Sequence, residues 1–205
     1  MRSHPLAALF FICAPIASAA AQSAEPIPVT ALSYGTLNQN DLALRVRNED
    51  VDIRFVPLDP KVTRLLANDA FQSLRSLVEA RRREIDSVAS RAGVAEPGLA
   101  LVSFFGLRSD TRFDPQTLTV RVRSRALQPL GVIPISARFT SHQLDLREQA
   151  SAIYLFEEDL PVDDSFSLSY GTLISEDWAS KQPTLDRERA RVSARARSSR
   201  PDTTR

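Results

Sequence analysis

The 205-residue chain contains only one cysteine and two histidines, and this scarcity excludes several chemistries. Cys13 and His4 lie in an N-terminal segment that we expect to be removed, which leaves His142 as the single imidazole of the mature chain. Zinc sites draw mostly on two or more Cys and His ligands, and a thiol nucleophile needs a cysteine. The mature chain can form neither, nor a disulfide, so its stability must come from a packed core.

Glycine-rich motifs are also missing from a chain with only six glycines. It contains no G-x-S-x-G, G-x-x-x-x-G-K-[ST] or G-x-G-x-x-G, which are typical of hydrolase nucleophile elbows, P-loops and dinucleotide sites. A serine triad would need His142, and we predict this histidine to be solvated or locally hydrogen-bonded in a turn between strands. The sequence therefore assigns no catalytic, metal-binding or cofactor-binding residue, and we predict no cofactor.

Residues 1–21 have the three-part layout of a secretory signal peptide. A basic start at Arg2 precedes an apolar run over 5–17, and small residues follow it. Cleavage after Ala21 and cleavage after Ala19 both fit this pattern. The apolar run is well short of the roughly 20 residues that cross a bilayer. We therefore predict export to the periplasm or the medium, with no membrane span left after cleavage.

Cys13 raises an alternative, a lipoprotein anchored through this cysteine. Lipid-modified cysteines follow small residues, whereas the bulky Phe11 and Ile12 precede Cys13, and Cys13 lies inside the apolar run instead of after it. The sequence therefore favours a small apolar residue in a discarded peptide. Residues 22–28 contain two prolines and are expected to form an extended linker.

The charged side chains, 24 Arg and two Lys against 25 acids, are unevenly distributed. Residues 25–180 carry 17 basic and 22 acidic side chains, whereas residues 181–205 carry eight basic and three acidic ones. Leu185 and Val192 are the only large apolar residues of this last stretch, so we predict a disordered Arg-rich tail. The tail would contact anionic surfaces or the acidic body weakly. We do not expect nucleic-acid binding, because no aromatic stacking platform accompanies the arginines.

Alternating apolar and polar residues predict a β-hairpin early in the mature chain. Every second residue is apolar over 42–46 and over 51–55, and the polar turn 48–50 joins the two segments. Charged residues then occupy the outer face of the hairpin, where we expect them to pair across the strands: Arg45, Arg47, Asp52 and Arg54.

The rest of the chain supplies further strands. Segment 99–105 is apolar on both faces and predicts a central strand. Other strands are expected at 118–122, 132–139, 150–156 and 165–170. We predict that residues 29–180 form one α+β domain, mainly β with one long helix, as an antiparallel β-sandwich of about seven strands with the helix packed on or beside it. An open α+β sheet is the alternative.

Two helices are expected in this domain, near 60–67 and 69–92. The Asp-Pro pair at 59–60 is a helix start signal. Apolar residues then recur at spacings of three and four, and Gly93 is expected to end the second helix in the left-handed conformation. Arg81 interrupts the apolar stripe. We expect its stem to pack against the core edge and its head to reach water, in preference to a role in ligand binding.

A repeated hexapeptide and a cluster of acids also stand out in the sequence, but neither predicts a binding or catalytic site. The segment Leu-Ser-Tyr-Gly-Thr-Leu occurs unchanged at 32–37 and at 168–173. Either the copies are equivalent strand-turn segments, or, as we favour, two strand ends use similar turn chemistry around glycine. Five acids lie at 157–159 and 163–164. Their spacing matches no Ca²⁺ loop and the turn glycine is missing, so we expect a solvated loop.

The sequence thus predicts the destination and fold of the protein more closely than its role. We expect an exported bacterial protein of the cell envelope, a non-catalytic module that binds or assembles with a protein or an envelope polymer. The alternative is a carboxylate-dependent hydrolase acting on an envelope or extracellular glycan, which needs neither Cys nor His. Two acids converging on a concave pocket would favour the hydrolase. An exposed apolar patch or a free sheet edge would favour the module.

Overall fold

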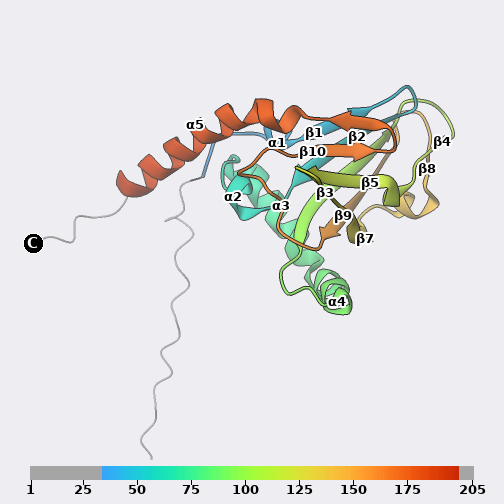
Figure 1. The fold of residues 1–205 in the computed structure, drawn as a ribbon, viewed down its shortest axis with the longest axis horizontal. Helices are drawn as coiled ribbons and strands as arrows, with labels where there is room; N and C mark the ends of the chain where they lie inside the picture. Colours follow the sequence, from blue (N-terminus) through green and yellow to red (C-terminus); the bar gives the residue numbers. More distant parts are fainter. Residues whose placement is uncertain (1–33, 199–205) are drawn as a thin grey trace, which may run out of the picture.

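A computed structural model describes residues 34–198 (Figure 1). The predicted signal peptide, linker and lipid-modified cysteine lie outside these residues. The described part is mixed α+β with its strands in antiparallel sheets, as expected from the sequence. Its long helix is C-terminal, which the sequence did not predict. None of the helices in this part combines the length and the apolar character that a membrane span requires.

The strands form two larger sheets and one short pair. The five-stranded sheet has the order β1 (Leu44–Arg47), β2 (Val51–Pro57), β3 (Gly98–Gly106), β9 (Gln149–Phe156), β7 (Pro129–Pro134). The four-stranded sheet has the order β11 (Leu173–Ser175), β10 (Ser167–Tyr170), β5 (Leu118–Val122), β6 (Arg125–Leu127). The short pair joins β4 (Thr111–Arg112) to β8 (Gln143–Leu144).

The helices lie between and around these strands. The α-helices are α1 (Gln39–Leu42), α2 (Pro60–Thr63), α3 (Asn68–Ala80), α4 (Arg82–Ala92) and α5 (Asp177–Ser198). Two short 3₁₀ helices are η2 (Pro115–Thr117) and η3 (Ala137–Ser141). Figure 1 shows α3 and α4 on one side of the five-stranded sheet and α5 reaching away from the strands.

The predicted hairpin is confirmed, and so is the central strand. In β1 and β2, Leu44 lies opposite Phe55 and Arg47 opposite Asp52, and β3 is the middle strand of its sheet. The strand expected over 132–139 is wrong in its second half, because β7 ends at Pro134 and η3 follows. A proline has no N–H to extend the ladder.

Aromatic side chains from the two larger sheets meet in one core. The rings of Phe104 on β3 and Tyr170 on β10 lie 6.0 Å apart, and those of Phe55 on β2 and Phe166 lie 6.4 Å apart. Tyr154 on β9 is fully buried, and its hydroxyl donates to the carbonyl oxygen of Pro115 at 3.1 Å. Because the chain has a single cysteine and cannot form an internal disulfide, this core supplies the stability that a disulfide would otherwise add.

The first helix starts as predicted but is shorter. Oδ1 of Asp59 accepts the N–H of Lys61 at 2.7 Å and caps α2. The helix was expected to continue to residue 67, whereas it ends at Thr63. Leu66 instead forms an isolated parallel bridge with Leu37, so pairing with the N-terminal segment replaces the last helical turn.

The single helix expected over 69–92 is two helices. Arg81, at φ −108° and ψ 8°, separates α3 from α4. The break lets α4 pack on β7, where Val88 lies against the backbone of Gly131. Gly93 ends α4 at φ 71°, as predicted. Arg81 keeps a third of its side chain exposed and pairs with Glu84 at 2.8 Å, so its head does reach the surface.

The prediction of a disordered tail over 181–205 is wrong as far as residue 198. Helix α5 begins at Asp177, before the predicted tail, and its Trp178 and Leu185 side chains are fully buried. The indole Nε1 of Trp178 donates to the carbonyl oxygen of Val162 at 3.3 Å. The sequence argument counted too few apolar residues for independent folding, but α5 packs on a body that already exists.

Charged groups hold the second half of α5. The Glu188 side chain is 2% exposed, and Oε1 accepts the backbone N–H of Thr36 at 2.9 Å and its hydroxyl at 3.2 Å. Arg191 and Arg195 pair with the same carboxylate at 3.2 and 3.3 Å. The arginines that suggested an unstructured polycation are therefore partly used to bind an acid of their own helix.

The described residues of the first copy, 34–37, have a different environment from the second copy, and neither interpretation of the repeat holds for these residues. Gly35 lies so close to the backbone of Leu65 that a Cβ would collide with its carbonyl oxygen. Gly171 has open space around it and forms the turn between β10 and β11 at φ 56°. Gly35 permits a close approach of two backbone segments, whereas Gly171 permits a positive φ. In their described residues the two copies therefore share no turn.

Candidate functional site

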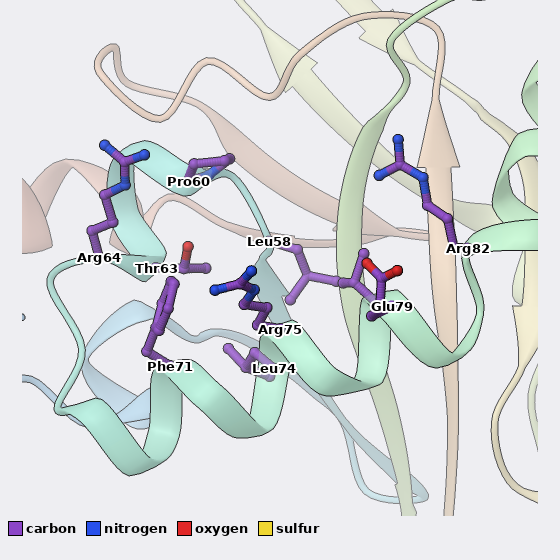
Figure 2. A pocket seen from close by; sticks show the side chains of 10 residues that line it. Leu58, Pro60, Thr63, Arg64, Phe71, Leu74, Arg75, Glu79 and Arg82 are labelled. Carbon is purple, nitrogen blue, oxygen red and sulfur yellow. The ribbon is translucent and has the colours of Figure 1, made fainter. Parts of the chain in front are cut away.

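A cleft with a volume of about 430 Å³ opens between α2 and α3 (Figure 2). This volume is in the range of small ligand sites. The cleft is lined by Leu58, Pro60, Thr63, Arg64, Phe71, Leu74, Arg75, Val78, Glu79 and Arg82. The start signal at Asp59-Pro60 positions one wall, and the apolar periodicity of α3 positions the other.

The floor of the cleft is apolar. Leu58, which follows β2, is 8% exposed and Leu74 is 3% exposed. Phe71 and Val78, one turn before and after Leu74 on α3, are only half-buried. The core thus covers only part of the apolar stripe of α3. The apolar surface that it leaves uncovered faces the cleft.

The rim of the cleft is charged and incompletely paired. Arg82 Nε pairs with Asp86 at 3.2 Å. The guanidinium groups of Arg64 and Arg75, and the carboxylate of Glu79, form no ion pair or side-chain hydrogen bond with the described residues. Figure 2 shows Arg75 rising from α3 beside Leu58 and Leu74, with Arg64 and Arg82 toward the two ends. The cleft therefore offers two free cations beside an apolar surface.

A second polar surface crosses the outer face of the five-stranded sheet. The strand register aligns Arg45, Arg54, Ser103 and Ser151 in one row. It aligns Arg47, Asp52, Phe105 and Gln149 in the next row. Because side chains alternate along a strand, both rows lie on the same face, opposite the buried core.

The charge pairing expected on this face is not found. Arg45 lies opposite Arg54, and Arg47 lies opposite Asp52 but forms no ion pair with it. Oδ1 of Asp52 and Nε of Arg54 are buried without a hydrogen-bond partner among the described residues. Burial, and then the charge of Arg45, lower the pKa of Arg54. The face therefore carries uncompensated positive charge.

Beside the arginines, the polar groups of β3 and β9 form an ordered cluster. The hydroxyl oxygens of Ser103 and Ser151 lie 2.8 Å apart. Gln149 Nε2 donates to both, at 3.2 and 2.9 Å, and the Ser136 hydroxyl accepts the N–H of Ser151 at 3.0 Å. Ser103 is 6% exposed, Ser151 is half-buried and Gln149 is exposed, so the network holds one exposed amide at the open end of the face.

His142 lies where the sequence places it, in a turn between β7 and β8. It ends η3 at φ 54° and is exposed. Its ring lies 5.7 Å from that of Phe113 and 6.3 Å from that of Phe139. These contacts are those of a surface imidazole resting on the edge of an aromatic cluster.

The acidic loop after β9 is tied to the body by ion pairs. Arg125 pairs with Glu157 and Glu158, each at 3.2 Å. Further pairs join Asp163 to Lys61 and Arg189, and Asp164 to Arg123. Within the described part of the chain, no group of three or more His, Cys, Asp or Glu could hold a metal ion.

Asp59 is the acid that bears on the hydrolase alternative. Burial raises its pKa, the hydrogen bond from Lys61 opposes this rise, and the charges of Asp159 and Asp163 add to it. Asp59, however, caps α2, and Asp163 pairs with Lys61 at 3.3 Å and with Arg189 at 2.9 Å. Neither acid lines the cleft, so the raised pKa has a structural cause and does not mark two acids converging on a pocket.

The chain was compared with protein-family models, curated proteins and solved structures, and no match was found. A functional assignment must therefore come from the side chains of this protein. In the described part of the chain, the cleft carries the unpaired Arg64 and Arg75, and the sheet face carries the unpaired Arg45, Arg47 and Arg54.

Sequence reasoning missed both surfaces in part. Arg64 was expected inside a longer helix, and Arg75 was not singled out, although it adjoins Leu74 on the apolar stripe. Ser103 and Ser151 each interrupt an otherwise apolar strand segment, and this interruption is the signal that could have found them. Their alignment with Arg54 depends on the register of three strands, which no single segment contains.

Proposed function

We propose that the protein is an exported, non-catalytic binding module of the bacterial cell envelope, built on a β-sandwich-like body. The observation that carries this proposal is the α2–α3 cleft, where an apolar floor lies beside the unpartnered guanidinium groups of Arg64 and Arg75. Export is supported by the signal-peptide layout of residues 1–21.

The chemistry of the cleft suits an extended peptide segment of a partner protein that alternates apolar and acidic side chains. The floor at Leu58, Leu74 and Val78 would bury the apolar side chains. Arg64 and Arg75 would each bind a carboxylate, for which the planar guanidinium offers paired N–H donors. Charge complementarity therefore favours an acidic segment over a basic one.

Fluorescence polarisation tests this assignment. The probe is a fluorescein-labelled decapeptide of alternating leucine and glutamate, and the matched probe replaces glutamate by lysine. We expect the glutamate peptide to bind and Arg64→Gln with Arg75→Gln to weaken it at least tenfold, about 1.4 kcal/mol. Raising the salt concentration should weaken it as well.

Arg91→Gln is the control, because Arg91 is exposed on α4 and donates to the carbonyl oxygen of Ser87 of its own helix. This variant should bind the glutamate peptide like the parent protein. Equal binding of the lysine peptide, or an equal loss in Arg91→Gln, would contradict a specific acidic-peptide cleft.

The glycan hydrolase is supported only by the raised pKa of Asp59, and the contacts of that carboxylate are those of a helix cap. A glycosidase of this kind needs two carboxyl groups across a cleft. The walls of the α2–α3 cleft contribute one, Glu79. The binding module is therefore the better-supported function.

A further inference from the structure

The outer face of the five-stranded sheet is covered at one end and open at the other. On this face of β9 the residues run Leu155, Ile153, Ser151, Gln149. Gly131 lies opposite Leu155, and Val88 of α4 packs against it. Helix α4 therefore covers the Leu155 end, and Gln149 at the other end is exposed. The two polar rows lie in this second half, where Arg45, Arg47 and Gln149 are exposed and Ser103 alone of the two rows is buried.

The arginines of this half destabilise the free protein. Like charges placed directly opposite each other in an antiparallel pair repel, and Arg45 and Arg54 are such a pair. The buried Nε of Arg54 adds an unsatisfied donor. Rotation of Arg54 toward a bound anion would remove both costs, because the anion would neutralise the pair and accept from the donor.

The neighbours of these arginines have the groups that recognise sugars. The exposed Gln149 and the half-buried Ser151 offer an amide and a hydroxyl group that can exchange hydrogen bonds with sugar hydroxyls. The buried Ser103 hydroxyl holds both in place. Phe105, half-buried between Asp52 and Gln149, offers an apolar ring on which a sugar face can stack. The row from Arg45 to Ser151 crosses four strands, about 14 Å at the usual strand spacing.

A small free anion fits this face poorly. Phosphate sites are built from convergent backbone N–H groups at turns or helix starts, whereas the backbone N–H groups here belong to the pairings of β1, β2, β3 and β9. A flat row with cations at one end and hydroxyls at the other suits an elongated ligand that carries both carboxylates and hydroxyl groups.

We propose that the open half of this sheet face binds an acidic polysaccharide, with Arg45 and Arg54 on its uronate carboxylates and with Gln149, Ser151 and Phe105 on its sugar rings. This site is separate from the α2–α3 cleft and does not depend on the peptide-binding proposal. A polymer of the envelope or of the extracellular matrix would present such carboxylates repeatedly.

Isothermal titration calorimetry with trigalacturonic acid tests this site, and the methyl ester of the same trisaccharide is the uncharged probe. We expect the purified protein to bind the acid at physiological salt and the ester at least tenfold more weakly. Arg54→Gln and Arg45→Gln should each weaken binding of the acid at least tenfold. Phe105→Ala should weaken both probes.

Two controls separate a site from general charge attraction. Arg121→Gln removes an exposed arginine of β5, on the other sheet, that has no ion pair in the described part, and it should bind the acid like the parent protein. Arg75→Gln in the cleft should also leave this binding unchanged. An equal loss in Arg121→Gln, equal affinity for the ester, no binding of the acid, or displacement by equimolar inorganic phosphate would each overturn the proposal.

Thermal unfolding without ligand gives an independent readout. If Arg54 serves only the fold, Arg54→Gln should lower Tm. Because Arg54 opposes Arg45 and buries an unpaired donor, we expect Tm to stay level or to rise by about 2–4 °C. A clear fall in Tm that accompanies the loss of binding would show a structural role and contradict the site.

Discussion

Helices α3 and α5 both lie on the body of the protein, but different interactions hold them there. In α3 the contacts are apolar: Leu74 is buried, and Phe71 and Val78 flank it along one stripe. In α5 the buried side chains are two apolar ones, Trp178 and Leu185, and one acid, Glu188. A helix can thus be held on the body by a few contacts with residues far away in the sequence. It does not need the continuous stripe of apolar residues by which helices are recognised in a sequence.

The strongest test of this contrast is the apolar anchor of α5. Trp178→Ala should lower the free energy of unfolding by about 3–5 kcal/mol, because it removes a fully buried indole together with one of the hydrogen bonds that the carbonyl oxygen of Val162 accepts. Urea unfolding followed by circular dichroism measures this loss, since the variant has no tryptophan to report fluorescence. A loss below about 1 kcal/mol would mean that α5 is not packed on the body.

The matching test on α3 is Leu74→Ala. We expect a loss of about 2 kcal/mol, at the low end for a buried leucine, because Leu74 borders the open cleft and water can enter part of the space that it leaves. The same urea titration compares it with Trp178→Ala. If Leu74→Ala lost more free energy of unfolding than Trp178→Ala, Leu74 would be the more important anchor and the contrast would be wrong.

The charged contacts of α5 are tested by Glu188→Gln. The amide still accepts from Thr36 but no longer neutralises Arg191 and Arg195, so we expect a loss of about 1–2 kcal/mol. Faster hydrogen exchange at the Thr36 amide should accompany it. Arg197→Gln, at an exposed position of the same helix, is the control and should change stability by less than about 0.5 kcal/mol.

The smallest expected effect concerns pH and the cap of α2. Burial raises the pKa of Asp59, so the folded state binds its proton more tightly than the unfolded state. The stabilisation from this group is present at low pH, below the pKa of about 4 that aspartate has in the unfolded chain. It is lost as the pH rises through the higher pKa of the folded state. Asparagine keeps the cap and removes this fall.

Asp59→Asn should therefore gain on the parent protein as the pH rises, by about 1–2 °C in Tm at neutral pH. Melting curves between pH 3 and 7 at constant salt measure the difference. A difference that stays the same at every pH would show that the cap, and not the charge of Asp59, sets the effect.

The elements that could be predicted are those that depend only on residues close together in the sequence. The hairpin, the β3 strand, the cap at Asp59 and the end at Gly93 each depend on residues close in sequence, and all are found. The break at Arg81 could not be predicted, because it follows from the packing of α4 on β7. Helix α5 failed for the same reason, since Thr36 and Glu188 meet only in the folded chain.

For the cleft and the sheet face, too, some features could be predicted from the sequence and others depend on the tertiary structure. The outward direction of Arg45, Arg47 and Arg54 was predicted from alternation, whereas their lack of ion pairs follows from the register that places Arg45 opposite Arg54. The unpartnered state of Arg64 and Arg75 likewise depends on where α2 ends and how α3 lies beside it. Residue types can be read from a sequence, but which of them remain free is a tertiary property.

The contact between Thr36 and Glu188 has a consequence for the order of folding. The two residues are 152 positions apart, so the N-terminal segment cannot acquire this contact until nearly the whole chain has been synthesised. Contacts of such long range close slowly, because the loop between them must lose its entropy first. For a chain that is exported, as we propose, this delay would keep the Thr36 end of the body incomplete until α5 has been synthesised.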